Sequence, residues 1–121
     1  MPDTLYPRST KDLAQRRHDL APEIEDAFKQ FSNKVFEEGA LTAKTKQLIA
    51  VAVAHVTQCP YGIRGHTKAA RRDGATPEEI MEAIWVAAEM RAGGAYAHSA
   101  LALDAIAPTA PSGGAEMTAN E

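Results

Sequence analysis

The sequence has a single cysteine and no excess of positive charge, and each shortage excludes a class of protein. One cysteine in 121 residues excludes an intramolecular disulfide framework of the kind that stabilises small secreted domains. A formal net charge of −3 and a pI near 5.8 provide no basic field for phosphate backbones, so we expect no nucleic-acid partner. A small-molecule substrate is the more natural partner.

Long apolar runs are also missing. The longest, Leu48–Val56, contains His55 and is about half as long as the roughly 20 residues that a membrane-spanning helix needs. The N-terminus lacks the basic-then-apolar pattern of an export signal. We therefore expect no membrane contact and a location in the reducing cytoplasm. The length of the chain and its 45% of hydrophobic residues fit one domain with a single core.

Helix-boundary residues recur along the chain, whereas the alternating apolar and polar runs typical of strands do not. The sequence therefore predicts an all-α fold of five to six helices in a single domain over residues 1–106. A flexible C-terminal tail is expected over residues 107–121, whose composition cannot bury much apolar surface. The expected helices run from Lys11 to Leu20, Pro22 to Gly39, about Thr42 to about Thr57, Pro60 to Gly74, and Pro77 to Ile106.

Two of these helices carry a distinctive apolar pattern. The third is apolar almost all round and is predicted to be the buried central helix. In the last, Gly93 and Gly94 either allow close backbone approach or break the helix in two. The second helix has one apolar face, formed by Ile24, Phe28, Phe31 and Val35.

Cys59 stands at the start of the fourth expected helix, and His66 follows it by two turns. At a helix start, free backbone N–H groups and the helix dipole favour a thiolate. His66 lies one turn beyond Gly62 and about 10 Å along the axis from Cys59, so it is better placed to serve a group at position 62. The alternative is that Cys59 is a small buried apolar residue without chemistry.

Three stretches, Leu41–Ala54, Cys59–Ala70 and Asp73–Ile80, together resemble the carboxymuconolactone decarboxylase and alkylhydroperoxidase D-like superfamily. In its peroxidase branch the resemblance implies a C-x-x-C-x-x-x-H motif and an upstream glutamate, which relay protons while a hydroperoxide is reduced to an alcohol. Cys59 matches the first cysteine and His66 the histidine, whereas the second cysteine falls on Gly62 and the glutamate on Gln47. The superfamily also implies trimers or hexamers.

The differences from the peroxidase motif at Gly62 and Gln47 limit the proton transfer and the thiol chemistry that the site can perform. Gln47 cannot titrate and so cannot act as a general base. Without a thiol at Gly62, a sulfenic acid on Cys59 needs an outside thiol or a second subunit to be reduced. A lone cysteine with scattered histidines is a weak ligand pattern, so we expect neither a metal nor another cofactor.

Four further side chains are candidates for a cleft beside Cys59 and His66, and each also has a simpler structural interpretation. His55 would add a catalytic group, or is a satisfied buried histidine. Tyr61 would donate a hydrogen bond to a substrate oxygen, or packs at the helix start. Glu89 would be a partly buried carboxylate, or is paired with an arginine such as Arg91. His98 would face the cleft, or faces solvent.

Three functions follow. The first hypothesis is a thiol-dependent hydroperoxide reductase with an incomplete C-x-x-C site, which uses a small-molecule substrate and a thiol reductant. The alternatives are a cofactor-free decarboxylase of a carboxymuconolactone-like acid, which needs a histidine and proton donors rather than a cysteine pair, and a noncatalytic oligomeric binding protein. The small residues Ala92–Ala95 and the apolar helices also predict a homo-oligomer, because a short chain gains stability by burying helix faces across an interface.

Overall fold

The fold of the chain is all-α, as predicted. The computed structural model describes residues 5–106, so residues 1–4 and the predicted tail 107–121 lie outside the described part. Within residues 5–106 there are five helices and no strand. The helices are α1 Lys11–Leu20, α2 Pro22–Phe36, α3 Ala43–Thr57, α4 Pro60–Arg72 and α5 Pro77–Ile106.

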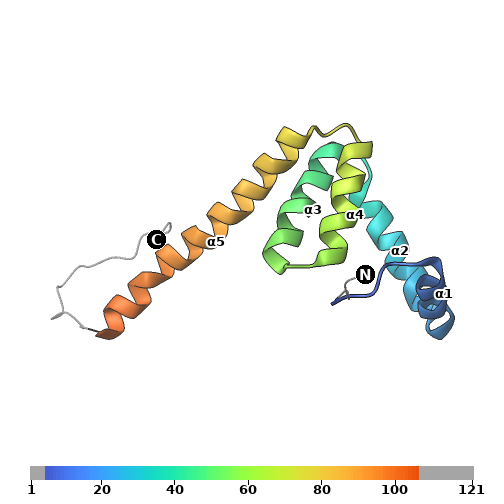
Figure 1. Ribbon diagram of the computed structural model, residues 1–121, viewed down its shortest axis with the longest axis horizontal. Coiled ribbons are helices and arrows are strands. Elements are labelled where there is room, and N and C mark those ends of the chain that lie inside the picture. Colours follow the sequence, from blue (N-terminus) through green and yellow to red (C-terminus); the bar gives the residue numbers. More distant parts are fainter. Residues whose placement is uncertain (1–4, 107–121) are drawn as a thin grey trace.

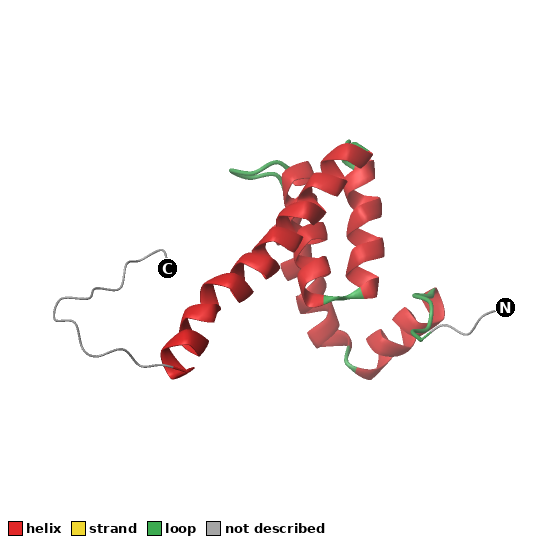
Figure 2. Ribbon diagram, turned by 60° about the vertical axis from the view of Figure 1, so that its left-hand side comes forward, coloured by secondary structure: helices red, strands yellow, loops and turns green. Residues whose placement is uncertain are grey.

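Helix α3 lies at the centre of the arrangement. It pairs with α4 in an antiparallel hairpin and packs along the first half of α5, while α1 and α2 lie on the other side of the hairpin (Figures 1 and 2). The apolar core is a cluster of small or branched residues where α3, α4 and the start of α5 meet. It consists of Val51, Ala70, Ala75 and Ile80, with Leu48 and Ile84 packed against it. Ala54 and Ala87 are buried as well.

Local capping explains the helix starts. The Thr42 hydroxyl accepts a hydrogen bond from the Thr45 amide at 3.1 Å and begins α3. Thr76 and Glu79 form a reciprocal capping box, with backbone-to-side-chain distances of 2.9 and 3.1 Å, at the start of α5. Both starts agree with the sequence to within one residue.

Two helices end earlier than expected. The second was expected to reach Gly39, but α2 ends at Phe36 because Glu37 turns to an extended conformation (φ −66°, ψ 153°). The fourth was expected to reach Gly74, but α4 ends at Arg72, and Gly74 takes a positive φ of 96° in the following turn. The last helix is continuous through Gly93 and Gly94, so the expected alternative of a break is wrong.

The expectation that the third helix is buried holds on one side only. Gln47, Val51 and Ala54 are buried, whereas Ile49 and Val53 remain about half exposed, at 48% and 52%. The reason is that α4 and α5 cover α3 from one side and leave its opposite apolar side open within a single chain. The apolar face of α2 is exposed in the same way.

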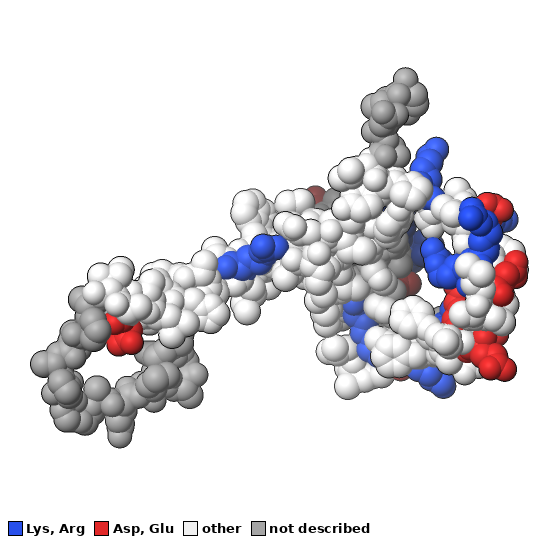
Figure 3. All heavy atoms as spheres, turned by 90° about the horizontal axis from the view of Figure 1, so that it is seen from below, with Lys and Arg blue, Asp and Glu red and all other residues white. Residues whose placement is uncertain are grey.

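The C-terminal half of α5 projects beyond the rest of the molecule (Figure 1). Its large apolar side chains are well exposed, with Tyr96 at 82% and Leu101 at 70%. Charged side chains gather at the opposite end, over α1 and α2, while the projecting helix is largely uncharged (Figure 3). No helix within residues 5–106 is long and apolar enough to cross a membrane.

Candidate functional site

Cys59 is the N-cap residue of α4. Its backbone is extended (φ −99°, ψ 104°), and its Sγ accepts a hydrogen bond from the Gly62 amide at 3.4 Å. The turn before it is tight, because the amides of Gln58 and Cys59 both donate to the Ala54 carbonyl oxygen and Gln58 takes the left-handed conformation. This turn places the half-buried thiol where the free N–H groups of α4 point.

Gly62 brings the backbone of α4 close to both the thiol and α3. A Cβ at this position would lie 3.5 Å from Cys59 Sγ and 3.2 Å from Ala54 Cβ. The second distance is tighter than ordinary packing, so any side chain here requires a small shift of Ala54. Glycine at this position therefore allows α4 to pack closely against Ala54 of α3.

His66 lies one turn after Gly62 on the same face of α4 and is held from two directions. Its Nδ1 donates to the Oε1 of Gln47 at 2.8 Å, and Gln47 is buried on α3. Its ring stacks on Phe36, with the centroids 5.2 Å apart and the planes at 24°. Because Nδ1 is the donor, the neutral imidazole carries its free lone pair on Nε2.

His55 and Tyr61 are both engaged within the chain. His55 Nδ1 donates to the Val51 carbonyl oxygen of its own helix at 2.8 Å. The Tyr61 hydroxyl donates to the Pro7 carbonyl oxygen at 2.6 Å, and the Tyr6 ring meets the Tyr61 ring edge-on at 6.1 Å. The structure therefore ties Tyr61 to the N-terminal segment instead of leaving its hydroxyl open toward a substrate.

Glu89 and His98 lie on exposed positions of α5. His98 belongs to the half of the helix that projects away from α3 and α4. Arg91, the suggested partner of Glu89, donates instead to the Val56 carbonyl oxygen at 2.9 Å. Within one chain the structure thus brings together Cys59 with Gly62 and His66 with Gln47, whereas the two α5 residues are not gathered with them.

Two residues near His66 were not predicted from the sequence. Phe36 is the last residue of α2, and its contact with His66 joins residues thirty positions apart. Lys46 on α3 donates to the carbonyl oxygens at the end of α2. The apolar periodicity of the sequence singles out neither residue, and both lie outside the motif residues of the family resemblance. Among the described residues, no group of three or more His, Cys, Asp or Glu side chains is arranged to hold a metal ion.

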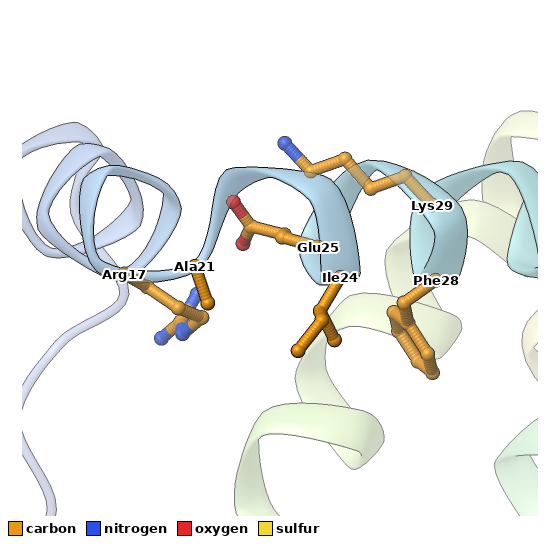
Figure 4. A pocket seen from close by; sticks show the side chains of 6 residues that line it. All are labelled: Arg17, Ala21, Ile24, Glu25, Phe28 and Lys29. Atoms are coloured by element: carbon orange, nitrogen blue, oxygen red, sulfur yellow. The ribbon is translucent and has the colours of Figure 1, made fainter.

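A separate open hollow lies between α1 and α2 (Figure 4). Its apolar floor is formed by Ile24 and Phe28, and charged side chains stand at its edge. It contains none of the candidate site residues. The full lining is Arg17, Ala21, Ile24, Glu25, Phe28 and Lys29.

Comparison with known proteins supports the sequence resemblance. The profile of the carboxymuconolactone decarboxylase family matches residues 22–105. A Paracoccus denitrificans protein described as uncharacterized protein 4 in cox locus is 60% identical over 103 residues, which cover 85% of this chain and 92% of that protein. An uncharacterized protein of Cupriavidus necator is 39% identical over 83 residues, which cover 67% of this chain and 74% of that protein.

Two solved structures share the fold. A carboxymuconolactone decarboxylase family protein of Legionella pneumophila, in its apo form, superposes with a TM-score of 0.61 at 34% identity, covering 67% of this chain and 75% of that chain. A protein of Methanobacterium thermoautotrophicum superposes with a TM-score of 0.64 at 38% identity, covering 68% of this chain and 94% of that chain.

Proposed function

The chain belongs to the carboxymuconolactone decarboxylase family, and from this premise we propose that it is a thiol-dependent hydroperoxide reductase in which Cys59 is the reacting group. The observation that carries the proposal is the hydrogen bond from the Gly62 amide to Cys59 Sγ at the N-terminus of α4. A hydrogen bond from a backbone amide and the positive end of a helix dipole both stabilise a cysteine thiolate.

The proposed reaction begins with attack of the Cys59 thiolate on the terminal oxygen of a hydroperoxide. The O–O bond breaks, the alkoxide takes up a proton to become an alcohol, and Cys59 becomes a sulfenic acid. An external thiol then attacks the sulfenic sulfur and releases water, and a second thiol reduces the mixed disulfide. The sum is one hydroperoxide and two thiols converted to an alcohol, a disulfide and water. A thiol-rich cytoplasm supplies the reductant, so the proposal includes that location.

His66 is the proposed proton carrier of this reaction. Its Nδ1 is occupied by Gln47, and its Nε2 is the atom that accepts or returns a proton. Gln47 orients the ring but exchanges no proton, because an amide does not titrate. We therefore expect slower turnover than a site with a carboxylate at this position would have.

A cofactor-free decarboxylase is the second candidate, and the His66–Gln47 pair favours it. Such a reaction needs a histidine to move a proton and leaves the thiol idle. Blocking Cys59 with an alkylating reagent distinguishes the two: activity on a lactone acid would survive the treatment, whereas hydroperoxide reduction would stop.

The deciding experiment measures hydroperoxide consumption with dithiothreitol as reductant, together with intact mass spectrometry. We expect the chain to consume peroxide and to gain one oxygen atom on Cys59 when the reductant is withheld, and Cys59→Ser to do neither. If Cys59 stays a free thiol and peroxide is not consumed, the redox proposal is wrong for this chain. Turnover by Gly62→Cys alone would show that Gly62 disables a peroxidase scaffold.

A further inference from the structure

A set of contacts joins the end of α2 to His66. Phe36 stacks on one face of the imidazole, with the planes only 24° from parallel. Gln47 accepts the hydrogen bond from Nδ1 at the edge of the same ring. Residues from α2, α3 and α4 therefore meet at this one side chain.

Lys46, next to Gln47 on α3, holds the end of α2 in place. Its Nζ donates to the carbonyl oxygens of Val35 at 2.8 Å and Glu37 at 2.6 Å, the residues on either side of Phe36. The last carbonyls of a helix have no donor within the helix, and a cation there complements the negative end of the helix dipole. Lys46 thus fixes the backbone that carries the Phe36 ring.

We propose that Phe36 and Lys46 form a clamp that positions His66, an inference that rests on the proposed function. The stacked ring resists rotation of the imidazole about its Cβ–Cγ bond, because turning the imidazole drives its edge into Phe36. With the ring held, Nδ1 stays against Gln47 and the lone pair stays on Nε2. Phe36 and Lys46 are positioning residues, since both act through His66.

The need for a clamp follows from the neutral partner of His66. A hydrogen bond to an amide oxygen is about half as strong as one to a carboxylate, so Gln47 alone restrains the ring weakly. Phe36 supplies the missing restraint from the face of the ring, and Lys46 supplies the support for Phe36.

The test is nitrogen-15 NMR of the full chain, which distinguishes a protonated Nδ1 from a protonated Nε2 in the neutral ring; the His66 signals are assigned by their loss in His66→Gln. We expect the Nδ1–H form to dominate in the unaltered chain and in Phe36→Tyr, which keeps the stack. Phe36→Leu is expected to give a mixture of both forms and about tenfold slower peroxide consumption. Leu20→Ala, which removes an exposed apolar side chain from α1, is the control and should alter neither.

Lys46→Met provides a second variant that leaves the aromatic ring in place, and it is expected to shift the His66 signals in the same direction. Unchanged His66 signals in folded Lys46→Met and Phe36→Leu would overturn the clamp, whatever the turnover. Shifted signals without any peroxide consumption by the unaltered chain would support the clamp and overturn the proposed function instead. The NMR signals of His66 therefore test the clamp, and peroxide consumption by the unaltered chain tests the proposed function, independently of each other.

Discussion

At the residue scale, the side chain at position 62 determines whether Cys59 has a nearby thiol with which to form a disulfide. An ideal Cβ at position 62 lies 3.6 Å from the Cys59 Cβ. Disulfides have Cβ–Cβ distances of about 3.5–4.5 Å, so the backbone already has the spacing that a disulfide between these positions requires. The fold therefore permits a disulfide at this site, and only the side chain at position 62 prevents it.

We predict that Gly62→Cys forms a disulfide with Cys59 under mild oxidation. The physical reason is the Cβ–Cβ spacing, at the expense of a small shift of Ala54. Intact mass spectrometry should show the loss of two hydrogen atoms, reversed by dithiothreitol. Gly65→Cys is the control, because a Cβ there meets nothing within 4 Å. Two thiols that remain free in Gly62→Cys would contradict the prediction.

Gln47 is the buried acceptor on which the orientation of His66 depends. Gln47→Ala leaves the Nδ1–H of a half-buried imidazole without its partner, which is expected to destabilise the fold by about 1–3 kcal/mol. Urea denaturation measures this loss. Gln30→Ala, an exposed glutamine on α2, should change the free energy of unfolding by less than about 0.5 kcal/mol. Equal effects of the two substitutions would argue against a structural role for the Gln47–His66 bond.

At the scale of elements, the α3–α4 connection is tight and slightly strained. Gln58 has a φ of 58°, the left-handed region that glycine adopts without cost. We predict that Gln58→Gly stabilises the chain by up to about 1 kcal/mol, since the steric cost at this position is about 1–2 kcal/mol and glycine loses more entropy on folding. Gln58→Ala keeps the Cβ and should give no gain. Thermal unfolding followed by circular dichroism compares the two, and a loss of stability in Gln58→Gly would refute the expectation.

The start of α5 is tied to α3 through Glu79. The Glu79 carboxylate accepts hydrogen bonds from the Thr76 amide and from the Lys44 ammonium, the latter at 3.1 Å between Nζ and Oε2. Both donors favour the charged form and hold the pKa of the Glu79 carboxyl below its ordinary value of 4.5. A carboxyl whose pKa is lower in the folded state stabilises the fold above its unfolded pKa, and this stabilisation disappears as the pH falls through the folded pKa.

We therefore predict that Glu79→Gln destabilises the chain near neutral pH and has little effect in acid. Urea denaturation at about pH 7 and about pH 3 measures the two differences from the unaltered chain. Glu82→Gln, an exposed carboxyl on the same helix, is the control. A Glu79→Gln effect of the same size at both pH values would show that charge is not responsible.

At the scale of the whole molecule, the most prominent feature is the apolar half of α5 that projects from the core (Figure 1). Leu101 and Leu103 are 70% and 65% exposed, and the apolar faces of α2 and α3 are open as well. Contiguous exposed apolar surface of this kind marks interaction sites in soluble proteins. We propose a homo-oligomer in which these faces are covered by further copies of the chain.

We predict that the chain is oligomeric and that Leu101→Glu weakens the assembly. Burial of a leucine side chain stabilises by roughly 1.5–3 kcal/mol, so its replacement by a charge should raise the dissociation constant by a factor of at least ten. Size-exclusion chromatography with light scattering measures the molecular mass over a range of concentrations. Ala14→Glu, on an exposed position of α1, is the control. A monomer at all concentrations of the unaltered chain would refute the assembly.

The sequence by itself determined the all-α class and the positions at which α3, α4 and α5 begin. These starts depend on local chemistry, in which a side chain such as Thr42, Cys59 or Thr76 meets an amide three residues later. The resemblance also placed Gln47 and His66 in one site, and the structure brings them into contact at 2.8 Å.

Only the tertiary structure decided what surrounds that pair. Phe36 reaches His66, and Tyr61 binds Pro7, across 30 and 54 residues, and no local pattern specifies such partners. The continuity of α5 through Gly93 and Gly94 was likewise open in the sequence, because glycine permits both a helix and a break. Local hydrogen bonds can be read from neighbouring residues, whereas contacts between helices depend on how the whole chain packs.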